Sequence, residues 1–338
     1  MKRSRVGALH PAWAAVLVIL PVLCGLAALC IGRISYPIAD IWNVLTAHFT
    51  GIEPDKQMGI VIWSIRMPRV LLAALVGAGL SVAGCAFQSL FANPLATPDT
   101  LGVASGTSFG AALALLLGCG LLGVQAIAFA FGILAVTLTW LSAAGKGRGL
   151  SSVVLGGIMI GSLFSSLVSL VKFTADTETQ LPAITYWLMG SLANAGFSSL
   201  KWGAPFIIAG IAVLFVLRWQ LNVLPLGEDE AKSLGSNIRL LRIVTIICAT
   251  AVTASSVAMC GQVGWVGLLI PHICRMAFGT NHRALIPASV SLGAAFLIIV
   301  DTLARSISAA EIPISVLTAI IGAPFFIVLM RRSRGWQI

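Results

Sequence analysis

Residues 12–31 read AWAAVLVILPVLCGLAALCI, twenty residues in a row without a charged side chain. An α-helix rises about 1.5 Å per residue, so a run of this length is enough to cross the ~30 Å hydrocarbon core of a bilayer. The apolar core of a signal peptide is shorter, at about 7 to 15 residues. We therefore interpret this run as a membrane-spanning helix.

The rest of the chain repeats this pattern. Of its 338 residues, 58% are hydrophobic and 9% are charged, whereas about a quarter of the residues in a soluble domain are charged. We predict one all-α integral membrane domain over residues 1–338. Its ten transmembrane helices are expected at about 12–31, 70–91, 101–117, 121–143, 150–171, 202–217, 240–259, 263–278, 285–303 and 312–329.

The basic residues indicate which side of the membrane each loop occupies. Ten spans put both termini on one side, and cytoplasmic loops are enriched in Lys and Arg. Placing the termini in the cytoplasm puts fourteen of the 21 Lys and Arg residues on that side and seven outside. We therefore predict cytoplasmic termini, which leaves the outer arginines Arg66, Arg69 and Arg305 in need of a separate reason.

Motifs for catalysis and metal binding are absent from the sequence. There is no G-x-x-x-x-G-K-[ST] nucleotide loop, no H-E-x-x-H and no G-x-S-x-G, and the seven cysteines lack C-x-x-C spacing. We therefore expect no catalytic residue, no metal site and no cofactor bound by this chain. Topology explains the net charge of +10, so we expect no nucleic-acid partner.

The predicted spans hold almost no ionisable residues, although an ion-driven carrier places such residues near mid-membrane. Asp301, near the outer end of the ninth span, lies four residues before Arg305. We interpret these two residues as an ion pair within one helix. A carrier powered by its own ion coupling is therefore disfavoured.

Two polar features are candidates for contact with other proteins. Residues 225–235 read PLGEDEAKSLG, with acids early and a lysine late as in a short helix, and predict either a docking helix for a cytoplasmic ATPase or a solvated connector. Arg66 and Arg69 lie three residues apart and share a face if the second span begins early. With Arg305 they are candidates to bind carboxylates of a soluble partner, or else lipid phosphates.

Glycine and serine are frequent in the second, third and fifth spans, for example at Gly77, Gly106, Gly157 and Ser165. Small residues let helices approach closely in lipid. They indicate tight helix packing, a narrow and weakly polar pathway, or both in one helix.

Several motifs along the chain point together to a known family. They are Arg66-Met67-Pro68-Arg69; Asn93-Pro94-Leu95-Ala96 with Pro98 and Leu101-Gly102-Val103; Trp187-Leu188-Met189-Gly190-Ser191-Leu192; Leu226-Gly227 through Ser233-Leu234-Gly235; Gly264-Trp265-Val266-Gly267-Leu268 with Ile270-Pro271-His272 and Arg275; and Gly322-Ala323-Pro324. In this order they resemble the FecCD-type permeases of binding-protein-dependent ABC importers, which carry ferric siderophores, haem and cobalamin. The resemblance covers nearly the whole chain.

The resemblance implies an assembly in the bacterial cytoplasmic (inner) membrane. Its permease has the type II ABC importer fold, with ten helices per subunit, and pairs with a second copy of itself or a close paralogue around one central pathway. Two cytoplasmic ABC ATPase subunits bind ATP and Mg, and an extracytoplasmic binding protein delivers the cargo. The chain itself is then not an enzyme but a subunit of an ATP-driven transporter.

The resemblance also implies roles for particular residues. Salt bridges to glutamates of the binding protein are expected from Arg66, Arg69 and Arg305. Coupling to the ATPase is expected from Gly227, Glu228, Asp229, Glu230, Ala231, Ser233 and Leu234. A cytoplasmic gate is expected at Leu150, Ser151 and Ser152, a short outer helix within residues 181–192, and a cytoplasmic surface at Asn93, Pro94, Pro271, His272 and Arg275. For Pro271, helix termination is an alternative role.

The cargo is not specified by these motifs, because selection is expected to rest largely with the binding protein. A ferric siderophore is our expectation, with haem, cobalamin and molybdate as alternatives. A secondary carrier is a more remote alternative.

Overall fold

The apolar runs of the sequence form helices in the computed structural model, which describes residues 10–50, 55–143, 150–226, 228–235, 237–308 and 310–332. Within these residues all regular secondary structure is helical, which confirms the predicted fold class. Ten helices overlap the ten predicted spans: α1 (Pro11–Cys30), α4 (Met67–Leu90), α5 (Val103–Leu116), α6 (Leu121–Ser142), α7 (Leu150–Thr174), α9 (Phe197–Val216), α11 (Ile238–Cys260), α12 (Val266–Phe278), α13 (His282–Ile307) and α14 (Ile314–Arg332).

Shorter elements lie between these helices. Before α4 come α2 (Ile38–Thr50), α3 (Lys56–Ile60) and the π-helical η1 (Val61–Arg66), so the chain is helical from Lys56 to Leu90. The 3-10 turn η2 (Pro98–Leu101) precedes α5, and α8 (Gln180–Leu188) follows α7. Between α9 and α11 lie η3 (Leu217–Asn222) and α10 (Glu228–Ser233).

Length divides the spanning helices into two groups. Among the described residues, seven helical stretches are long and apolar enough to cross a membrane: Pro11–Cys30, Lys56–Leu90, Leu121–Ser142, Leu150–Thr174, Phe197–Asn222, Ile238–Cys260 and His282–Ile307. The apolar helices α5, α12 and α14 are shorter, with 14 residues in α5 and 13 in α12. The ten predicted spans are therefore seven long helices and three short ones.

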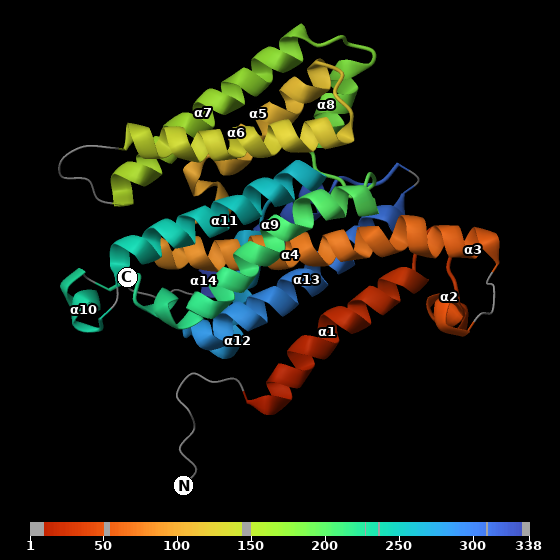
Figure 1. The fold of residues 1–338 in the computed structure, drawn as a ribbon, viewed down its shortest axis with the longest axis horizontal. Coiled ribbons are helices and arrows are strands. Elements are labelled where there is room, and N and C mark those ends of the chain that lie inside the picture. The colour runs from red at the N-terminus through yellow and green to blue at the C-terminus, as the bar shows by residue number, and fades with distance from the viewer. Residues whose placement is uncertain are drawn as a thin grey trace.

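The helix α4 lies at the centre of the bundle (Figure 1). Every residue from Val76 to Leu90 is buried, and α4 contacts α9, α11, α12 and α13. Helices α5, α6 and α7 form a layer on one side, whereas α1 lies on the opposite side against α13 and α4. Helices α2 and α3 lie at one end of the bundle and α10 lies at the other (Figure 1). We refer to these as the α2–α3 end and the α10 end.

Glycines allow α4 to meet its neighbours backbone to backbone. A methyl group at Gly77 would overlap the carbonyl oxygen of Gly293 on α13, and one at Gly84 would overlap that of Gly267 on α12. Close approach of this kind is how small residues stabilise helix pairs in lipid. The predicted packing role is therefore confirmed at these positions.

The serines of α7 have different surroundings. Ser162, Ser165, Ser166 and Ser169 are exposed on the surface of the described chain. Gly157, by contrast, packs against the backbone of Thr100 in η2. One helix thus carries both a close-packed glycine and a weakly polar open face, the combination that the sequence left open.

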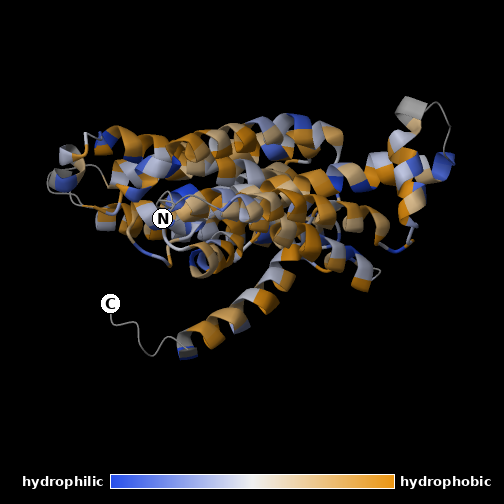
Figure 2. Ribbon diagram, turned by 90° about the horizontal axis from the view of Figure 1, so that it is seen from below, coloured by the Kyte–Doolittle hydropathy of each residue, from blue (hydrophilic) through white to orange (hydrophobic). Residues whose placement is uncertain are grey.

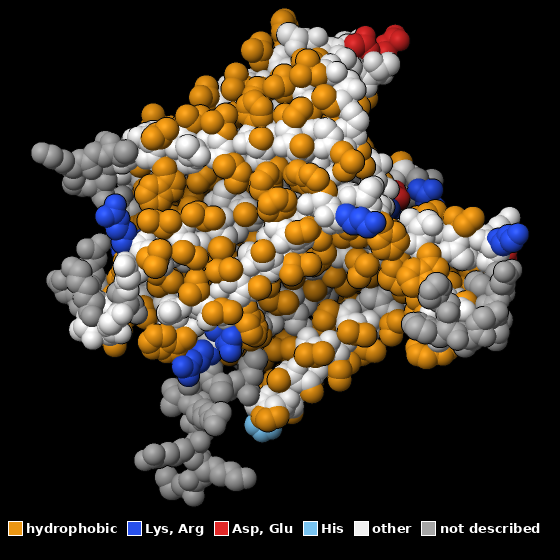
Figure 3. Space-filling view, viewed as in Figure 1, with side chains coloured by type: hydrophobic (Ala, Val, Ile, Leu, Met, Phe, Trp, Pro, Cys, Tyr) orange, Lys and Arg blue, Asp and Glu red, His pale blue; other side chains and the backbone are white. Residues whose placement is uncertain are grey.

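The surface is apolar along the bundle and charged toward its ends. In the view of Figure 3, hydrophobic side chains cover the middle of the molecule, and most Lys and Arg side chains lie toward the two edges. Figure 2 shows the same distribution along the ribbon, with hydrophobic residues on nearly every long helix. An apolar band between two charged edges is the surface of a multi-pass membrane protein, because this band faces lipid.

Candidate functional sites at the two ends of the bundle

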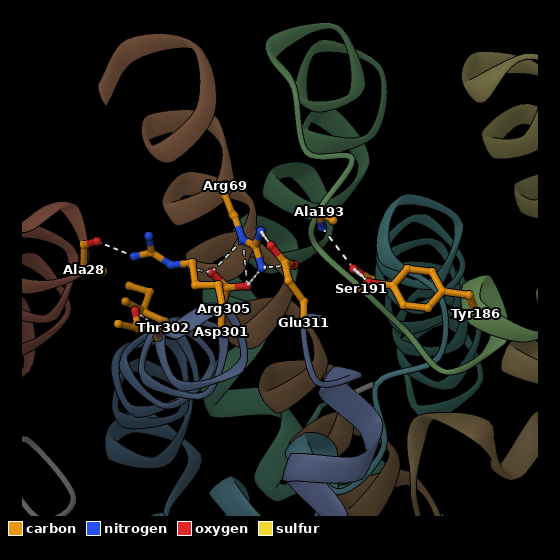
Figure 4. Close-up of polar contacts among 10 residues, drawn as sticks. Ala28, Arg69, Tyr186, Ser191, Ala193, Asp301, Thr302, Arg305 and Glu311 are labelled. Atoms are coloured by element: carbon orange, nitrogen blue, oxygen red, sulfur yellow. Dashed lines mark hydrogen bonds and ion pairs between the residues drawn. The ribbon is translucent and has the colours of Figure 1, made fainter. Parts of the chain in front are cut away.

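Three arginines and two acids gather at the α2–α3 end. Arg69 on α4 binds two carboxylates (Figure 4): its Nε donates to Asp301 Oδ1 at 2.9 Å, and its Nη1 and Nη2 each donate to a Glu311 oxygen at 2.9 Å. Asp301 lies in α13, and Glu311 lies between α13 and α14. Arg305, one turn after Asp301, has its Nε 3.7 Å from Asp301 Oδ2. These four residues, together with Arg66, are called the arginine cluster below.

The arginine cluster also holds the end of α1. Arg66 donates through Nη1 to the Leu29 carbonyl oxygen and through Nη2 to that of Ile34. Arg305 donates through Nη2 to the Ala28 carbonyl oxygen (Figure 4). The last carbonyl oxygens of a helix receive no hydrogen bond from the helix itself. The two guanidinium groups supply these bonds and so cap α1. Gly32 packs against both groups and leaves no space for a side chain.

The arginine cluster is buried, with exposed fractions of 5% for Arg66, 6% for Arg69, 7% for Arg305 and 1% for Asp301. The Glu311 side chain is 20% exposed. The Asp301–Arg305 ion pair expected from the sequence is present, although Asp301 has shorter contacts with Arg69. All three arginines thus have partners within the chain, and their predicted binding to a soluble partner stays a prediction.

At the α10 end, a short helix is anchored by one residue and otherwise open. Ala231 is fully buried against Val223 and Ile238. Glu230, Ser233 and Leu234 are exposed. Of the other residues predicted to couple to an ATPase, Glu228 and Asp229 belong to α10, and Gly227 lies outside the described residues. The segment therefore presents an exposed surface at this end of the bundle.

Two further predicted positions follow α4 at the same end. Asn93 and Pro94 are exposed in a turn, in which Asn93 Oδ1 accepts the Leu95 N–H at 2.9 Å. Ala92, just before them, has a φ of 48°, a left-handed conformation that a non-glycine residue rarely adopts. The family motif thus forms a sharp, exposed turn that closes the central helix.

Pro271 does not end its helix, because α12 continues through it to Phe278. Helix termination, the alternative role considered for this proline, is therefore wrong. Proline has no N–H and leaves the carbonyl four residues earlier without its helical partner. Here that carbonyl belongs to Gly267, and it accepts a hydrogen bond from Gln88 Nε2 on α4 at 3.3 Å. A side chain of the neighbouring helix thus replaces the missing donor.

His272 and Arg275, the other predicted residues of α12, are half-buried. His272 lies edge-on to Phe326 of α14, with ring centroids 5.6 Å apart. Arg275 Nη2 donates to Gln88 Oε1 at 2.6 Å. Both side chains therefore contact neighbouring helices of the same chain, and a surface role toward an ATPase stays a prediction.

A cavity of about 440 Å³ lies between η2, α5 and α7. Its lining is polar or small, and consists of Asp99, Thr100, Ser105, Gly157, Ile158, Gly161, Ser162 and Ser165. Asp99 Oδ1 accepts the Ala104 N–H at 3.0 Å, so this carboxylate caps α5 while facing the cavity. Asp99 also lines a second cavity of about 180 Å³ that reaches Gln262 and Trp265. These cavities are the candidates for a pathway lining.

The predicted gate residues occupy the first turn of α7. Ser151 is exposed, and Leu150 and Ser152 are half-buried. They lie on the helix that lines the larger cavity through Gly157 and Gly161. A gate at these residues stays a prediction.

The motif that follows α8 joins three helices. The Ser191 N–H donates to the Cys260 carbonyl oxygen at the end of α11 at 2.8 Å, and the Ile314 N–H at the start of α14 donates to the Gly190 carbonyl oxygen at 3.0 Å. Gly190 has a φ of +75° and lies against the backbone of Gln262, so no other residue fits there. Ser191 also contacts Tyr186 of α8 and the Ala193 N–H (Figure 4).

Some site residues were not predicted. Glu311 and Asp99 were not selected, and neither were Asn222 and His282, which lie 2.9 Å apart (Oδ1 to Nδ1). The chain has only 11 acidic residues, so an acid beside an apolar run was a usable signal for Glu311 and Asp99. No group of three or more His, Cys, Asp or Glu that could hold a metal occurs among the residues described.

The fold and the two polar ends define a class: a helical, multi-pass membrane protein with a polar cavity between η2, α5 and α7, a buried arginine cluster at one end and an exposed short helix at the other. Comparison with known proteins gives the family. Residues 18–332 match the model of the FecCD transport family, so the chain belongs to this family, as the sequence motifs predicted. It is an ABC importer permease of the FecCD type.

Particular relatives agree with this assignment. The molybdate import permease MolB of Haemophilus influenzae is 43% identical over 94% of this chain and 95% of the relative. The hemin transport permease HmuU of Yersinia pestis is 34% identical over 94% and 95% of the two chains. A solved structure of an inward-facing metal-chelate type ABC transporter has a TM-score of 0.86 and 39% identity, and the match covers 96% of this chain and all of that one. These relatives are transporter subunits, and a partner ATPase and a substrate-binding protein are expected with this chain.

Proposed function

We propose that the chain forms the membrane pathway of a binding-protein-dependent importer that carries a metal chelate, specifically a ferric siderophore, into a bacterial cell. Two copies of the chain would enclose the pathway in the cytoplasmic membrane, with both termini in the cytoplasm. What supports this proposal most is the similarity over almost the whole chain to a metal-chelate type transporter. The chain would supply no catalytic residue and bind no cofactor, since ATP and Mg belong to the partner ATPase.

The exposed surface of α10 would receive the ATPase. Its residues Glu230, Ser233 and Leu234 are open, while the buried Ala231 fixes the helix to the bundle. ATP binding would close the two ATPase subunits, move α10 and open the pathway toward the cytoplasm at Leu150, Ser151 and Ser152. A helix that is anchored on one side and open on the other is suited to transmit such a movement.

The arginine cluster would receive the binding protein. Carboxylates of the partner would take the place of Glu311, whose side chain is more exposed than those of Arg69, Asp301 and Arg305. Arg69 holds Glu311 and Asp301 at once, so an exchange would free one side of its guanidinium and leave the other paired. Ionic contacts of this kind fix the register of two proteins and accelerate their association.

Molybdate is the second candidate cargo, because a molybdate permease shares 43% identity with this chain. The carboxylate of Asp99 lines the larger cavity and would repel a compact dianion, since the repulsion between like charges grows as they approach. A large chelate spreads its charge over many atoms and meets less repulsion. This difference favours the chelate.

The test is co-purification followed by uptake. The tagged chain is purified from its native host in mild detergent, and the ATPase and binding protein that come with it are reconstituted in liposomes. Uptake is then measured with a ⁵⁵Fe hydroxamate siderophore, haemin, ⁵⁷Co-cobalamin and ⁹⁹Mo-molybdate. ATP-dependent uptake of the ⁵⁵Fe chelate alone is the expected result. Preferential uptake of another labelled compound would identify that compound as the cargo instead.

A secondary carrier predicts a different pattern. Its uptake would persist without ATP and stop when an ionophore removes the ion gradient. A chain that purifies without an ATPase and behaves in this way would overturn the importer proposal.

A further inference from the structure

A chain of hydrogen bonds crosses the α10 end of the bundle. Ser89 Oγ on α4 lies 2.7 Å from His282 Nε2, and His282 Nδ1 lies 2.9 Å from Asn222 Oδ1. The backbone N–H of His282 donates to the same Asn222 oxygen at 3.0 Å. Since an amide oxygen only accepts, His282 donates through Nδ1, and its Nε2 accepts the hydroxyl proton of Ser89. Three elements, α4, α13 and η3, are thereby joined.

A second branch begins at the preceding residue of α4. Gln88 donates through Nε2 to the Gly267 carbonyl oxygen at 3.3 Å and accepts at Oε1 from Arg275 Nη2 at 2.6 Å. Both partners belong to α12, and the Gly267 carbonyl is the one that Pro271 leaves free. The side chains of Gln88, Ser89, Asn222, Arg275 and His282 are called the polar clasp below.

The polar clasp is connected to α10 through buried apolar contacts. Leu221 and Leu224 anchor η3 and the turn after it in the main core. Val223, in the same turn, packs with Ala231 of α10 and Ile238 of α11. A displacement of α10 that left η3 behind would open this cluster and expose Ala231, which has no exposed surface. Movement of α10 is therefore expected to carry η3 and Asn222 with it.

We propose that the polar clasp transmits the movement of α10 to α4 and α12. Asn222 would carry it to His282 and Ser89, and Gln88 would carry it on to Gly267 and Arg275. This inference rests on the proposed function, in which an ATPase moves α10. Asn222, His282, Ser89 and Gln88 are then positioning residues, because each acts through the helix that it holds by hydrogen bonds.

The composition of the polar clasp fits this role better than that of an inert support. When both partners of a buried hydrogen bond are replaced by apolar groups of the same shape, stability changes little, so helix packing alone does not require these polar side chains. Directional hydrogen bonds instead fix the register of four elements, α4, α12, α13 and η3, relative to one another. The acceptor and donor of each bond lie on different elements, so the bonds resist relative sliding of those elements.

Hydrogen exchange of the permease–ATPase complex tests the inference without any cargo. Exchange is measured in residues 228–235 and 91–97, before and after the ATPase is trapped with ATP and vanadate. In the wild type we expect the hydrogen-exchange rates of both segments to change on trapping. In the Ser89→Ala/Asn222→Ala double variant we expect 228–235 to change as before, and the response of 91–97 to fall at least about fivefold, the lower end of typical coupling between sites.

A matched control removes the same atom from the same helix. Ser81 is a buried serine of α4 whose hydroxyl has no hydrogen-bond partner among the described residues, so Ser81→Ala should respond like the wild type. Ser89→Thr retains the hydroxyl and should keep the wild-type response of 91–97. This second variant separates loss of the hydrogen bond from a general effect of changing the position.

The possible outcomes distinguish this inference from the function on which it rests. If residues 228–235 do not change in the wild type, α10 is not the ATPase contact and the proposed coupling fails. If they change but 91–97 does not, or if 91–97 responds equally in the double variant, the polar clasp is not the route. The wild-type measurement alone can overturn the inference, even if the double variant does not fold.

Discussion

The two ends of the bundle are held together by different chemistry. At the α2–α3 end, Arg69, Asp301 and Glu311 form ion pairs with nitrogen–oxygen distances of 2.8 to 2.9 Å. At the α10 end, the contacts of Ser89, His282 and Asn222 are hydrogen bonds without a charged acceptor. Removing one member of a buried ion pair leaves an uncompensated charge, whereas losing one neutral hydrogen bond costs much less.

This difference separates a rigid end from an adjustable one. The arginine cluster holds α1 through backbone carbonyl oxygens and joins α4 to α13 through the carboxylate of Asp301, so a change of partner at Arg69 requires another carboxylate. The polar clasp keeps its elements in register through hydrogen bonds, and the loss or lengthening of one of them costs less than the loss of a carboxylate. On the proposed function, the α10 end moves with the ATPase and the other end binds a soluble partner, which fits this arrangement of the two chemistries.

The largest effect is expected from Asp301→Ala, which breaks the rigid end. The change leaves Arg305 without a carboxylate and Arg69 with only Glu311, and loss of one partner from a buried pair costs about 3–5 kcal/mol. We expect most of the protein to unfold or to lose its monodisperse peak. Size-exclusion chromatography and thermal unfolding in detergent measure this.

The control for this variant is Glu178→Gln, which neutralises an exposed carboxylate in the turn before α8. It should unfold at the wild-type temperature. Equal stability of Asp301→Ala and the wild type would show that the arginine cluster does not hold this end together.

A smaller effect is expected from Gly84→Ala, which strains the adjustable end. The new methyl group would overlap the Gly267 carbonyl, and overpacking of this kind costs about 1–3 kcal/mol. Since Gln88 lies one turn further along α4, we expect its bond to that carbonyl to lengthen and the response of residues 91–97 to ATP trapping to weaken. Thermal unfolding and hydrogen exchange report the two effects.

Gly264→Ala is the matched control, because no atom lies near a methyl group built there. If Gly84→Ala and Gly264→Ala unfold at the same temperature, the contact between α4 and α12 is looser than described.

The smallest effect on stability is expected from Glu311→Gln. Glu311 is partly exposed and Arg69 retains Asp301, so the loss should be about 1 kcal/mol or less, as for pairs near a surface. On the proposed function, the same change removes the competitor of the partner's carboxylates, and association with the binding protein should strengthen. Unfolding and surface plasmon resonance measure the two quantities, and weaker association would contradict the exchange at Arg69.

Local features of the sequence predicted most of the fold. Apolar runs predicted where the ten helices lie, because each run is long enough to be recognised by itself. Arg66 and Arg69 were expected to share a helix face if the second span began early. This condition is met, because the chain is helical from Lys56 to Leu90. The short amphipathic helix α2 was not predicted, because its apolar stretch, Ile38–Ala47, is too short to suggest a span.

Local sequence patterns could not predict which residues pair with one another in each site. Arg69 and Glu311 are 242 residues apart, and Gln88 and Gly267 are 179 residues apart. The sequence identified the arginines by their side of the membrane and predicted the Asp301–Arg305 pair within one helix, but it gave no sign that Asp301 and Glu311 would both pair with Arg69. In the same way, Pro271 suggested a helix end, and the side chain that lets the helix continue lies on another helix.

The shortness of α5 has a consequence for the electrical insulation of the cell. Its 14 residues extend about 21 Å, less than the ~30 Å of the hydrocarbon core, so the irregular backbone of η2 covers part of the thickness. Such backbone is tolerated at that depth only when protein or water surrounds it. We therefore expect membrane voltage to fall across a thinner barrier here, where Gly157 packs against Thr100, and a larger side chain or a gap at this contact to change ion leakage first.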